Sequence, residues 1–401
     1  MKLIILTQYY PPETGAPQRR LSDLARRLAA IGHQVQVLTA KPNYPEGKIF
    51  PGYKKGLFCR EREGGIEVIR VWLYPNQSKS LALRLANYFS FVLSSILIGT
   101  FTLGRADFLI VESPPLFLGI SARFLAAVKR ARLVFNVSDL YPETAISLGM
   151  LDQPLLQKLL YALEAWCYAG ADFITGQTEG IVASIRARFP HKKVHLLTNG
   201  IDLESVARKG RPAANDREGK FRVGYAGIIG HAQRLDTVVR AAGQLAGHPE
   251  IEFSIFGDGP LLEDLVALAE ETGAANLHFH GRRSHEEIMA EMESWDAGLV
   301  PLANVPLMKG ALPSKMFEVM GMELPVILCA PAGEASSLIE TAQAGVCVQA
   351  ENVDALVEAV LHLAAHPDLG KQYGQNGRAY IEQHFNRQVI AEKFVAFITF
   401  S

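Results

Sequence analysis

The sequence predicts an α/β protein built from two successive doubly wound domains. Apolar segments of strand length alternate with helical segments over residues 1–203, and the alternation restarts over residues 221–386. At 401 residues the chain is too long for one ordinary core. Between the two halves, residues 204–220 are charged, poor in large apolar side chains and interrupted by glycine and proline, which is typical of a linker.

The composition is that of a globular protein without a charge bias. Hydrophobic residues make up 49% of the chain and charged residues 20%, and the formal net charge is -1, so no nucleic-acid partner is expected. The four cysteines are scattered without C-x-x-C spacing, and we interpret them as reduced core thiols of a cytoplasmic protein. The opening segment MKLIILT lacks the features of an export signal and is predicted to be the first strand.

Residues 85–104 form an uncharged run that is long enough to cross a bilayer. Its serines, threonines, asparagine and glycines weaken that interpretation. Our first expectation is a helix buried against the sheet of a large α/β domain. The second is a helix that lies at the membrane surface, entered through Lys79 and Arg84, and the third is a true membrane span.

The loop after the first strand, QYYPPETGAPQ, leads into a helix predicted from about Arg19 to Ile31. It contains nothing like G-x-G-x-x-G, which counts against a dinucleotide oxidoreductase. Gly15, Arg19 and Arg20 instead place a flexible backbone and two guanidinium groups at a helix N-terminus, which suits an anionic ligand. The alternative is that both arginines are solvated helix surface.

Two acidic residues follow the predicted strand RLVFNVS. Asp139 and Glu143 stand at its carboxyl end, and open α/β sheets bind ligands at that edge. Both are therefore candidates for the functional site. The alternative for Asp139 is that it merely caps the next turn.

Three glycine-containing loops in the second half each follow a strand and precede a helix. They are GIIGH (227–231), GDGP (257–260) and GRRS (281–284). Glycine lets backbone N–H groups approach a phosphate closely, although such turns need glycine for their geometry in any case. Pro260 suits a first helical position, and Ser284 with Glu287 predicts a capping box. Three such loops on one edge are stronger evidence for a phosphate site than any one of them.

The segment 306–327 is predicted to form a loop, a short helix and a strand. Lys315 and Glu318 are three residues apart and share a helix face, while Met316, Phe317 and Met320 point into the core. A cation in the first helical turn is unfavourable unless an anion is bound there, and a diphosphate would remove that conflict. A carboxylate such as Glu318 can accept hydrogen bonds from two neighbouring ribose hydroxyls. The alternative is a solvated ion pair, worth about 0.2–0.5 kcal/mol.

Several motifs together resemble those of glycosyltransferase family 4. They are YYPPETGAPQRR with GHQVQVLT, SDLYPE, TNGID, VGYAGIIGHAQRLD, FGDGP, HFHGRRS and LPSKMFEVMGMELPVI, and they span nearly the whole chain. The resemblance implies a GT-B fold, in which two Rossmann-like domains face a central cleft. The N-terminal domain would bind the acceptor, the C-terminal domain the nucleotide-sugar donor, and residues 387–401 would form a helix crossing back. The PPETGAPQ and LPSK-FE forms resemble a branch with bacterial L-fucosamine-type transferases of surface-polysaccharide synthesis.

The resemblance also implies roles for particular positions. Glu318 matches the second glutamate of the family's E-x7-E motif, which holds the donor ribose, but Gly310 stands where the first glutamate is expected. Ile228 replaces the usual arginine of the first phosphate loop, and the usual lysine falls near Gln233. Lys315 is therefore expected to carry the charge that faces the diphosphate.

The expected sites can be stated in full. The donor would bind at Gly15, Gly227, Gly230, Arg234, Gly257, Gly259, Arg282, Arg283, Lys315 and Glu318; the catalytic residues would be Lys315, Glu318 and Asp139; the acceptor would meet Arg19, Asp139 and Glu143. The reaction implied is transfer from a nucleoside diphosphate sugar, UDP-linked, with retention at the anomeric carbon. Catalysis would come mostly from positioning and from electrostatic stabilisation of the departing diphosphate.

The expected acceptor is a lipid-linked saccharide at the cytoplasmic face of the inner membrane, as in lipopolysaccharide synthesis. The chain contains no D-x-D sequence, so neither a metal nor another cofactor is expected. Two alternatives stay open: a sugar-nucleotide 2-epimerase, and a non-catalytic partner subunit that keeps donor binding. An NAD dehydrogenase is disfavoured, because neither half begins with the glycine fingerprint.

Overall fold

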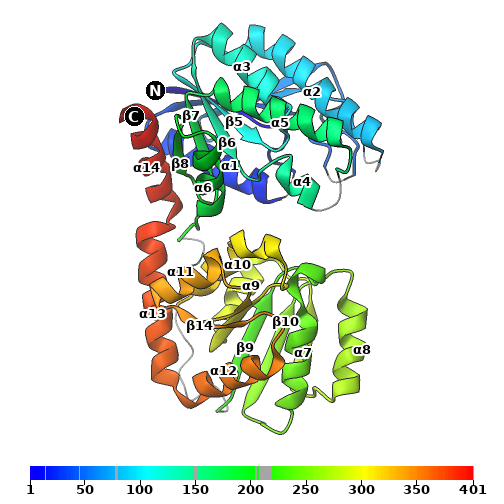
Figure 1. Ribbon diagram of the computed structural model, residues 1–401, viewed down its shortest axis with the longest axis vertical. Helices are drawn as coiled ribbons and strands as arrows, with labels where there is room; N and C mark the ends of the chain where they lie inside the picture. The colour runs from blue at the N-terminus through cyan, green and yellow to red at the C-terminus, as the bar shows by residue number, and fades with distance from the viewer. Residues whose placement is uncertain are drawn as a thin grey trace. The chain divides into compact units, whose positions relative to one another are not determined.

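The computed structural model describes residues 1–13, 15–44, 46–76, 80–147, 151–203, 206 and 219–400 (Figure 1). The chain divides into two compact units. One comprises Met1–Thr198 with Ala391–Ser401, and the other comprises Asn199–Ile390. Most of the predicted linker, residues 204–220, lies outside the described residues, as does Lys79.

The first unit contains an eight-stranded sheet in the order β3-β4-β2-β1-β5-β6-β7-β8. Its strands are β1 (Lys2–Leu6), β2 (Gln34–Ala40), β3 (Phe58–Glu63), β4 (Ile66–Val71), β5 (Phe108–Ser113), β6 (Arg132–Val137), β7 (Phe173–Gly176) and β8 (Lys193–Leu196). Every neighbouring pair is parallel except β3 with β4. Parallel strands covered on both faces are almost continuously apolar, and all six residues of β5 are buried.

Sequence reasoning missed strand β3. Its sequence, FCRERE, has no apolar alternation, and most of its side chains are exposed because it lies at the edge of the sheet. What holds it is the antiparallel ladder with β4 and two ion pairs to that strand, Arg60 with Glu67 and Arg70 with Glu61. An edge strand of this kind leaves no hydrophobic pattern to read.

Helices cover both faces of this sheet. Helices α2 (Leu81–Thr102), α3 (Leu118–Lys129) and α5 (Pro154–Ala169) lie side by side over one face (Figure 1). The remaining helices of the first unit are α1 (Ala16–Ala30), α4 (Glu143–Ser147) and α6 (Glu179–Arg188). Helix α1 therefore begins three residues before the predicted start at Arg19. Helices α1, α2, α3, α4 and α6 each follow a strand, so their N-termini lie at the carboxyl edge of the sheet, whereas α5 follows α4.

Helix α2 contains the long apolar run, and only one of its faces matches the expectation of a buried helix. Phe91, Val92 and Ser95 are buried, and the Ser95 hydroxyl donates to the Ser121 hydroxyl of α3 at 2.9 Å. The opposite face is exposed, and only 28% of an 18-residue apolar window within Ala82–Thr102 is buried. By length and composition this helix is capable of crossing a membrane.

The second unit contains a six-stranded, wholly parallel sheet in the order β11-β10-β9-β12-β13-β14. The strands are β9 (Phe221–Ala226), β10 (Ile251–Phe256), β11 (Leu277–Gly281), β12 (Ala297–Pro301), β13 (Val326–Ala330) and β14 (Gly345–Gln349). The helices are α7 (Leu235–Gln244), α8 (Leu262–Thr272), α9 (His285–Met292), α10 (Ser314–Gly321), α11 (Glu334–Ala342), α12 (Val353–Ala365) and α13 (Pro367–His384). The doubly wound architecture predicted for this half is confirmed.

Two local predictions in this unit had different outcomes. The capping box is confirmed: the Ser284 hydroxyl accepts from the Glu287 backbone N–H, and the Glu287 carboxylate accepts from the Ser284 N–H. The placement of Pro260 at a first helical position is wrong, because α8 begins at Leu262. The loop instead turns at Gly259, which has a positive φ of 159°.

The last helix, α14 (Arg387–Phe400), belongs to both units. At its start the Arg387 side chain donates to the backbone oxygen of Asn199 at 3.2 Å, within the second unit. At its end Phe394 and Ile398 are fully buried, and Phe397 stacks on His195 of the first unit with ring centroids 4.6 Å apart. The final helix therefore crosses back to the first unit, as the resemblance implied.

Candidate functional site

The three glycine loops of the second unit interlock at the carboxyl edge of its sheet. The Gly227 N–H donates to the Phe256 oxygen at 2.9 Å, and the Gly257 N–H donates to the Gly281 oxygen at 2.9 Å. A third bond of 2.9 Å runs from the Ile229 N–H to the Asp258 oxygen. The loops after β9, β10 and β11 therefore form one hydrogen-bonded surface.

Glycine is required at two of these positions by close backbone approach. A Cβ at Gly257 would overlap the carbonyl oxygen of Gly227, and a Cβ at Gly259 would overlap that of Ile229. Both residues also have positive φ angles, 150° and 159°, which side-chain-bearing residues rarely adopt. A Cβ at Gly227 would lie 2.7 Å from Lys315 Nζ. The lysine ammonium therefore lies against the first glycine loop.

Lys315 is held by Tyr225, a residue that sequence reasoning missed. The Lys315 Nζ donates to the Tyr225 hydroxyl at 2.7 Å and lies 3.9 Å from the ring centroid. The tyrosine hydroxyl in turn donates to the backbone oxygen of Ile228 at 2.7 Å. The side chain of Tyr225 is fully buried at the end of β9, and burial raises its pKa. The phenol is therefore neutral, and it orients the lysine without neutralising it.

Burial lowers the pKa of Lys315 to about 7, while the nearby charge of Glu318 raises it. Lys315 belongs to the first turn of α10, and Pro313, the N-cap residue just before that helix, offers no side-chain cap. Helix N–H groups that lack a cap favour an anion at that end. A bound anion would also favour the protonated lysine. The site is therefore arranged to take up negative charge.

Glu318 lies on the same helix as Lys315 and faces His285. Its carboxylate oxygen is 3.9 Å from His285 Nδ1, and both side chains are partly exposed. His285 is the first residue of α9, and the Ser284 capping box fixes its position. Sequence reasoning missed this histidine. The signal was available, because His285 directly follows the GRRS loop and the capping box that were recognised.

The other donor-site candidates of this unit differ in their surroundings. Arg282 and Arg283 are exposed on the third loop, beside His285. Gly230 precedes a short 3-10 helix, His231–Gln233, with ordinary extended backbone. Gly310 ends another 3-10 helix, Pro306–Gly310, and a Cβ there would meet open space. The position of the missing glutamate would therefore accept a side chain.

The Arg234 side chain is directed toward two acidic residues and not toward Lys315. Its guanidinium makes two 2.9 Å bonds to the Asp236 carboxylate and a 2.7 Å bond to Glu351. These partners raise the pKa of Arg234, the hydrogen bond to Asp236 most, and they compensate its charge. An adjacent cavity of about 450 Å³ between α7 and α8 also contains Asp264 and Glu271. This acidic pocket suits a diphosphate poorly, so Arg234 is not grouped with Lys315.

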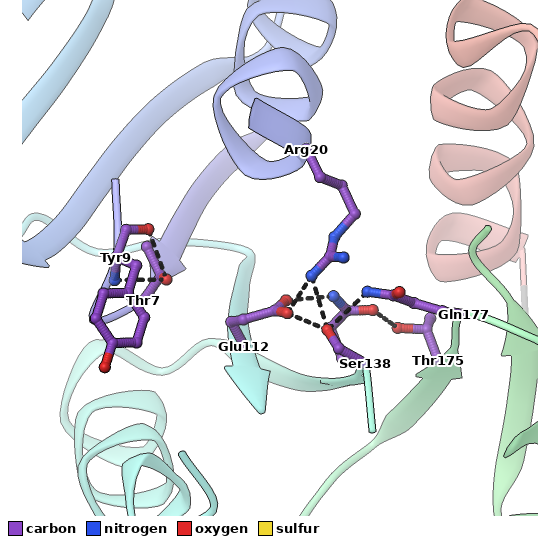
Figure 2. Close-up of polar contacts among 8 residues, drawn as sticks. Thr7, Tyr9, Arg20, Glu112, Ser138, Thr175 and Gln177 are labelled. Atoms are coloured by element: carbon purple, nitrogen blue, oxygen red, sulfur yellow. Dashed lines mark hydrogen bonds and ion pairs between the residues drawn. The ribbon is translucent and has the colours of Figure 1, made fainter. Parts of the chain in front are cut away.

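In the first unit, a buried polar network joins the carboxyl ends of three strands (Figure 2). The Glu112 carboxylate at the end of β5 is 3% exposed and accepts hydrogen bonds from Arg20 of α1, Asn136 of β6 and Ser138. The network extends to β7, where Thr175 donates to Asn136 Oδ1 at 2.6 Å and Gln177 donates to Ser138 Oγ at 2.7 Å. Sequence reasoning missed Glu112.

This network corrects the expectation of two arginines facing an anionic ligand. The Arg20 guanidinium is turned inward onto Glu112 and onto Ser138, which it reaches at 2.7 Å. Arg19 is exposed, and so is Glu143 in the first turn of α4. Gly15 is the N-terminal cap residue of α1. Of the two arginines, only Arg19 is presented at the surface.

Asp139 follows Ser138 at the same edge, and its side chain reaches the surface. Desolvation by the surrounding protein raises the pKa of Asp139, while the charge of Arg20 lowers it. The loop after β1 is anchored to the segment after β2, because the buried Glu13 carboxylate accepts from the backbone N–H groups of Asn43 at 2.6 Å and Tyr44 at 2.8 Å. Burial raises the pKa of Glu13, and these two bonds lower it.

Comparison with known proteins identifies the class. Residues 15–200 match a family model described as a glycosyl transferase 4-like domain, and residues 207–380 match one described as glycosyl transferases group 1. Two Rossmann-like units with these matches define a GT-B glycosyltransferase. Within that class, the protein is a glycosyltransferase of the family 4 type.

Individual relatives are similar over their full length. WcaI of Escherichia coli K12, which carries the provisional name colanic acid biosynthesis glycosyl transferase, is 26% identical over 98% of this chain and 99% of its own. Sucrose-phosphate synthase from Thermosynechococcus elongatus superposes with a TM-score of 0.72 at 17% identity, over 99% of this chain and 98% of its own. Anabaena HepE in complex with UDP superposes with a TM-score of 0.71 at 15% identity, over 100% of both chains. At these identities the two structures show the fold alone.

Proposed function

We propose that the protein transfers a glycosyl group from a UDP-sugar to a saccharide acceptor with retention at the anomeric carbon. The observation that carries the proposal is the half-buried Lys315 side chain against the interlocked glycine loops. A cation at a helix N-terminus, beside backbone N–H groups that approach without side chains, suits a diphosphate. The complex of Anabaena HepE with UDP supports uracil as the base.

Each charged group then has a role in the reaction. Lys315 and the first turn of α10 stabilise the negative charge that develops on the departing diphosphate. Glu318 accepts hydrogen bonds from the two ribose hydroxyls. Arg282 and Arg283 lie on the loop whose backbone contacts the nucleotide base. Since Gly310 has no side chain, the transferred sugar is held by other groups than the first glutamate of the motif. Catalysis comes mostly from positioning.

On the acceptor side, Arg19, Asp139 and Glu143 of the first unit contact the saccharide. We propose a lipid-linked saccharide of cell-surface polysaccharide synthesis, used at the cytoplasmic face of the membrane. Two observations support it: the exposed apolar face of α2, and the similarity to WcaI, named for colanic acid biosynthesis. The sequence motifs PPETGAPQ and LPSK-FE support a place in the branch that resembles bacterial L-fucosamine-type transferases.

Donor binding is tested by isothermal titration with UDP, GDP and ADP. We expect UDP to bind best. Glu318→Gln removes charge-assisted bonds and is expected to weaken UDP binding about 10-fold or more. The matched control is Glu340→Gln, an exposed acid on α11 of the same unit. Unchanged affinity in the Glu318 variant would refute the ribose role.

The reaction is tested with UDP-sugars and acceptors. NMR of the product is expected to show the donor's anomeric configuration, and an inverted product contradicts retention. Conversion of the UDP-sugar to an epimer without acceptor would favour the isomerase alternative. Transfer to soluble saccharides with none to lipid-linked ones would exclude the acceptor proposed here.

A further inference from the structure

Helix α2 exposes an apolar stripe along its outer face. Leu93, Leu97 and Phe101 recur every four residues, and 61%, 63% and 86% of their surface is exposed. The inner face of the same helix packs on α3 through the Ser95 to Ser121 hydrogen bond. The stripe is therefore not needed for folding of the unit.

The neighbouring helices extend this stripe into a surface. Helix α3 adds Phe124 and Val128, and α5 adds Leu155, Leu159 and Trp166, all of them exposed. Helix α3 packs against both α2 and α5, and Figure 1 shows the three helices together on one side of the sheet. We call these eight side chains (Leu93, Leu97, Phe101, Phe124, Val128, Leu155, Leu159 and Trp166) the α2–α3–α5 surface. Exposed apolar side chains on three neighbouring helices indicate an interaction site.

The exposed charged side chains of these three helices are positive. Arg84 of α2 and Lys158 of α5 are exposed, and Arg123 of α3 lies 3.9 Å from the ring centroid of Trp166. The acidic residue of these helices, Glu164, is buried and paired with Arg188. Asp107 and Asp152 are exposed outside the helices. Basic residues around leucine, phenylalanine and tryptophan side chains complement an anionic lipid surface.

Both ends of α2 are tied to the protein, which favours a helix lying along a bilayer over one that crosses it. Lys129 of α3 donates to the backbone oxygens of Thr100 and Leu103 at 2.7 Å each, near the C-terminal end of α2. Near its N-terminal end, Asn87 accepts from the buried Gln8 side chain at 2.7 Å. Gln8 belongs to the loop that follows β1, so the N-terminal part of α2 is tied to the carboxyl edge of the sheet.

We propose that the α2–α3–α5 surface docks the protein onto an anionic lipid bilayer. The apolar side chains enter the boundary between headgroups and acyl chains, and Arg84, Arg123 and Lys158 contact the lipid phosphates. A second copy of the chain is a poorer occupant, because a twofold interface would bring these positive charges together. The inference concerns a different surface from the donor site and holds whichever nucleotide is used.

Vesicle co-sedimentation of the full chain tests the proposal. We expect binding to vesicles of equal parts phosphatidylglycerol and phosphatidylcholine, and weaker binding to phosphatidylcholine alone. Leu93→Ser combined with Leu97→Ser is expected to lower partition to the anionic vesicles about 10-fold. Leu57→Ser, at a 69% exposed leucine before β3, is the matched control and should bind as the wild type does.

A second pair, Leu155→Ser with Leu159→Ser on α5, keeps the test valid if the α2 variant does not fold. Equal partition of wild type and both folded variants would overturn the proposal, and so would absence of binding to anionic vesicles. A wild-type dimer that the α2 variant converts to a monomer, without vesicle binding, would assign the surface to a second copy. UDP affinity, measured in the same samples, separates this result from failure of the proposed transferase function.

Discussion

Lys315 is the residue at which burial and charge conflict most directly. Its half-buried side chain places the amine against Tyr225 and the first glycine loop, and desolvation lowers its pKa to about 7. A neutral phenol cannot compensate an ammonium, so protonation near neutral pH depends on what else is bound. A diphosphate beside Gly227 would favour the charged form. Ligand binding and proton binding are therefore coupled at this residue.

The first prediction is a pH dependence of nucleotide affinity. The pKa of Lys315 is about 7 without ligand and is raised by a bound anion. At a pH above the pKa of the unliganded protein, Lys315 is mostly neutral and must take up a proton when UDP binds. UDP affinity should therefore fall by up to about 10-fold per pH unit. Isothermal titration between about pH 7 and about pH 9, in buffers of different ionisation enthalpy, measures both affinity and proton uptake. Lys315→Met should bind UDP weakly and without this pH dependence, whereas a sloping profile in that variant would assign the proton elsewhere.

The second prediction concerns Gly257. An alanine there combines a positive φ with overlap of the Gly227 carbonyl, so Gly257→Ala should cost about 1–3 kcal/mol and abolish UDP binding. Urea denaturation and titration with UDP measure the two effects. Gly247→Ala is the control, because its Cβ would meet open space. Retained UDP binding in the Gly257 variant would show that the interlocked loops are not the nucleotide site.

At the scale of elements, the Glu112 network fixes where helix α1 meets the sheet of the first unit. One carboxylate at the end of β5 binds the α1 side chain Arg20, the β6 side chain Asn136 and Ser138 just beyond β6 (Figure 2). These elements also carry Arg19 and Asp139, the acceptor-site candidates. Because the pair is largely removed from water, loss of one partner leaves the other charge uncompensated.

The third prediction follows from that burial. Glu112→Gln should destabilise the protein by about 3 kcal/mol, because the Arg20 guanidinium loses its countercharge. Adding Arg20→Met should cost much less than the sum of the single changes. Urea denaturation of the four proteins of this double-mutant cycle gives the coupling energy. Glu67→Gln, which removes the exposed pair with Arg60, should cost under about 1 kcal/mol. Additive effects of the Arg20 and Glu112 changes would contradict the network's role.

At the scale of the whole molecule, the two units contain unequal shares of the candidate site residues. The second unit, Asn199–Ile390, is one continuous piece with its own cores and contains every donor-site candidate except Gly15. The first unit is discontinuous, because the end of the chain from Ala391 onward completes it, with Phe394 and Ile398 of α14 buried in it. The proposed donor site is therefore separable in the fold from the proposed acceptor site.

The fourth prediction tests this separation. A fragment comprising residues 199–390 should unfold in one cooperative transition and bind UDP within about 10-fold of the full chain, because the glycine loops and Lys315 are intact. It should show no transferase activity. Circular dichroism during urea denaturation and isothermal titration provide the measurements. A folded fragment that does not bind UDP would mean that the first unit contributes a large part of the donor site.

The sequence alone determined the features that depend on local backbone chemistry. Alternating apolar segments predicted two doubly wound units, because the spacing of apolar residues along the chain differs between strands and helices. The glycine loops and the Ser284 capping box were recognised for the same reason, since each imposes its own geometry. The family motifs led to the GT-B fold. The edge strand β3 was not predicted, because its charged sequence has no alternation of apolar and polar residues.

Only the tertiary structure decided which side chains act together. Lys315 meets Tyr225 across 90 residues, Arg20 meets Glu112 across 92, and Arg234 meets Glu351 across 117. No local pattern encodes such partners, because they are set by which strands become neighbours in the sheet. The same is true of α2, whose composition is apolar all round. Packing against α3 decided which face is buried, and thereby which face is left exposed.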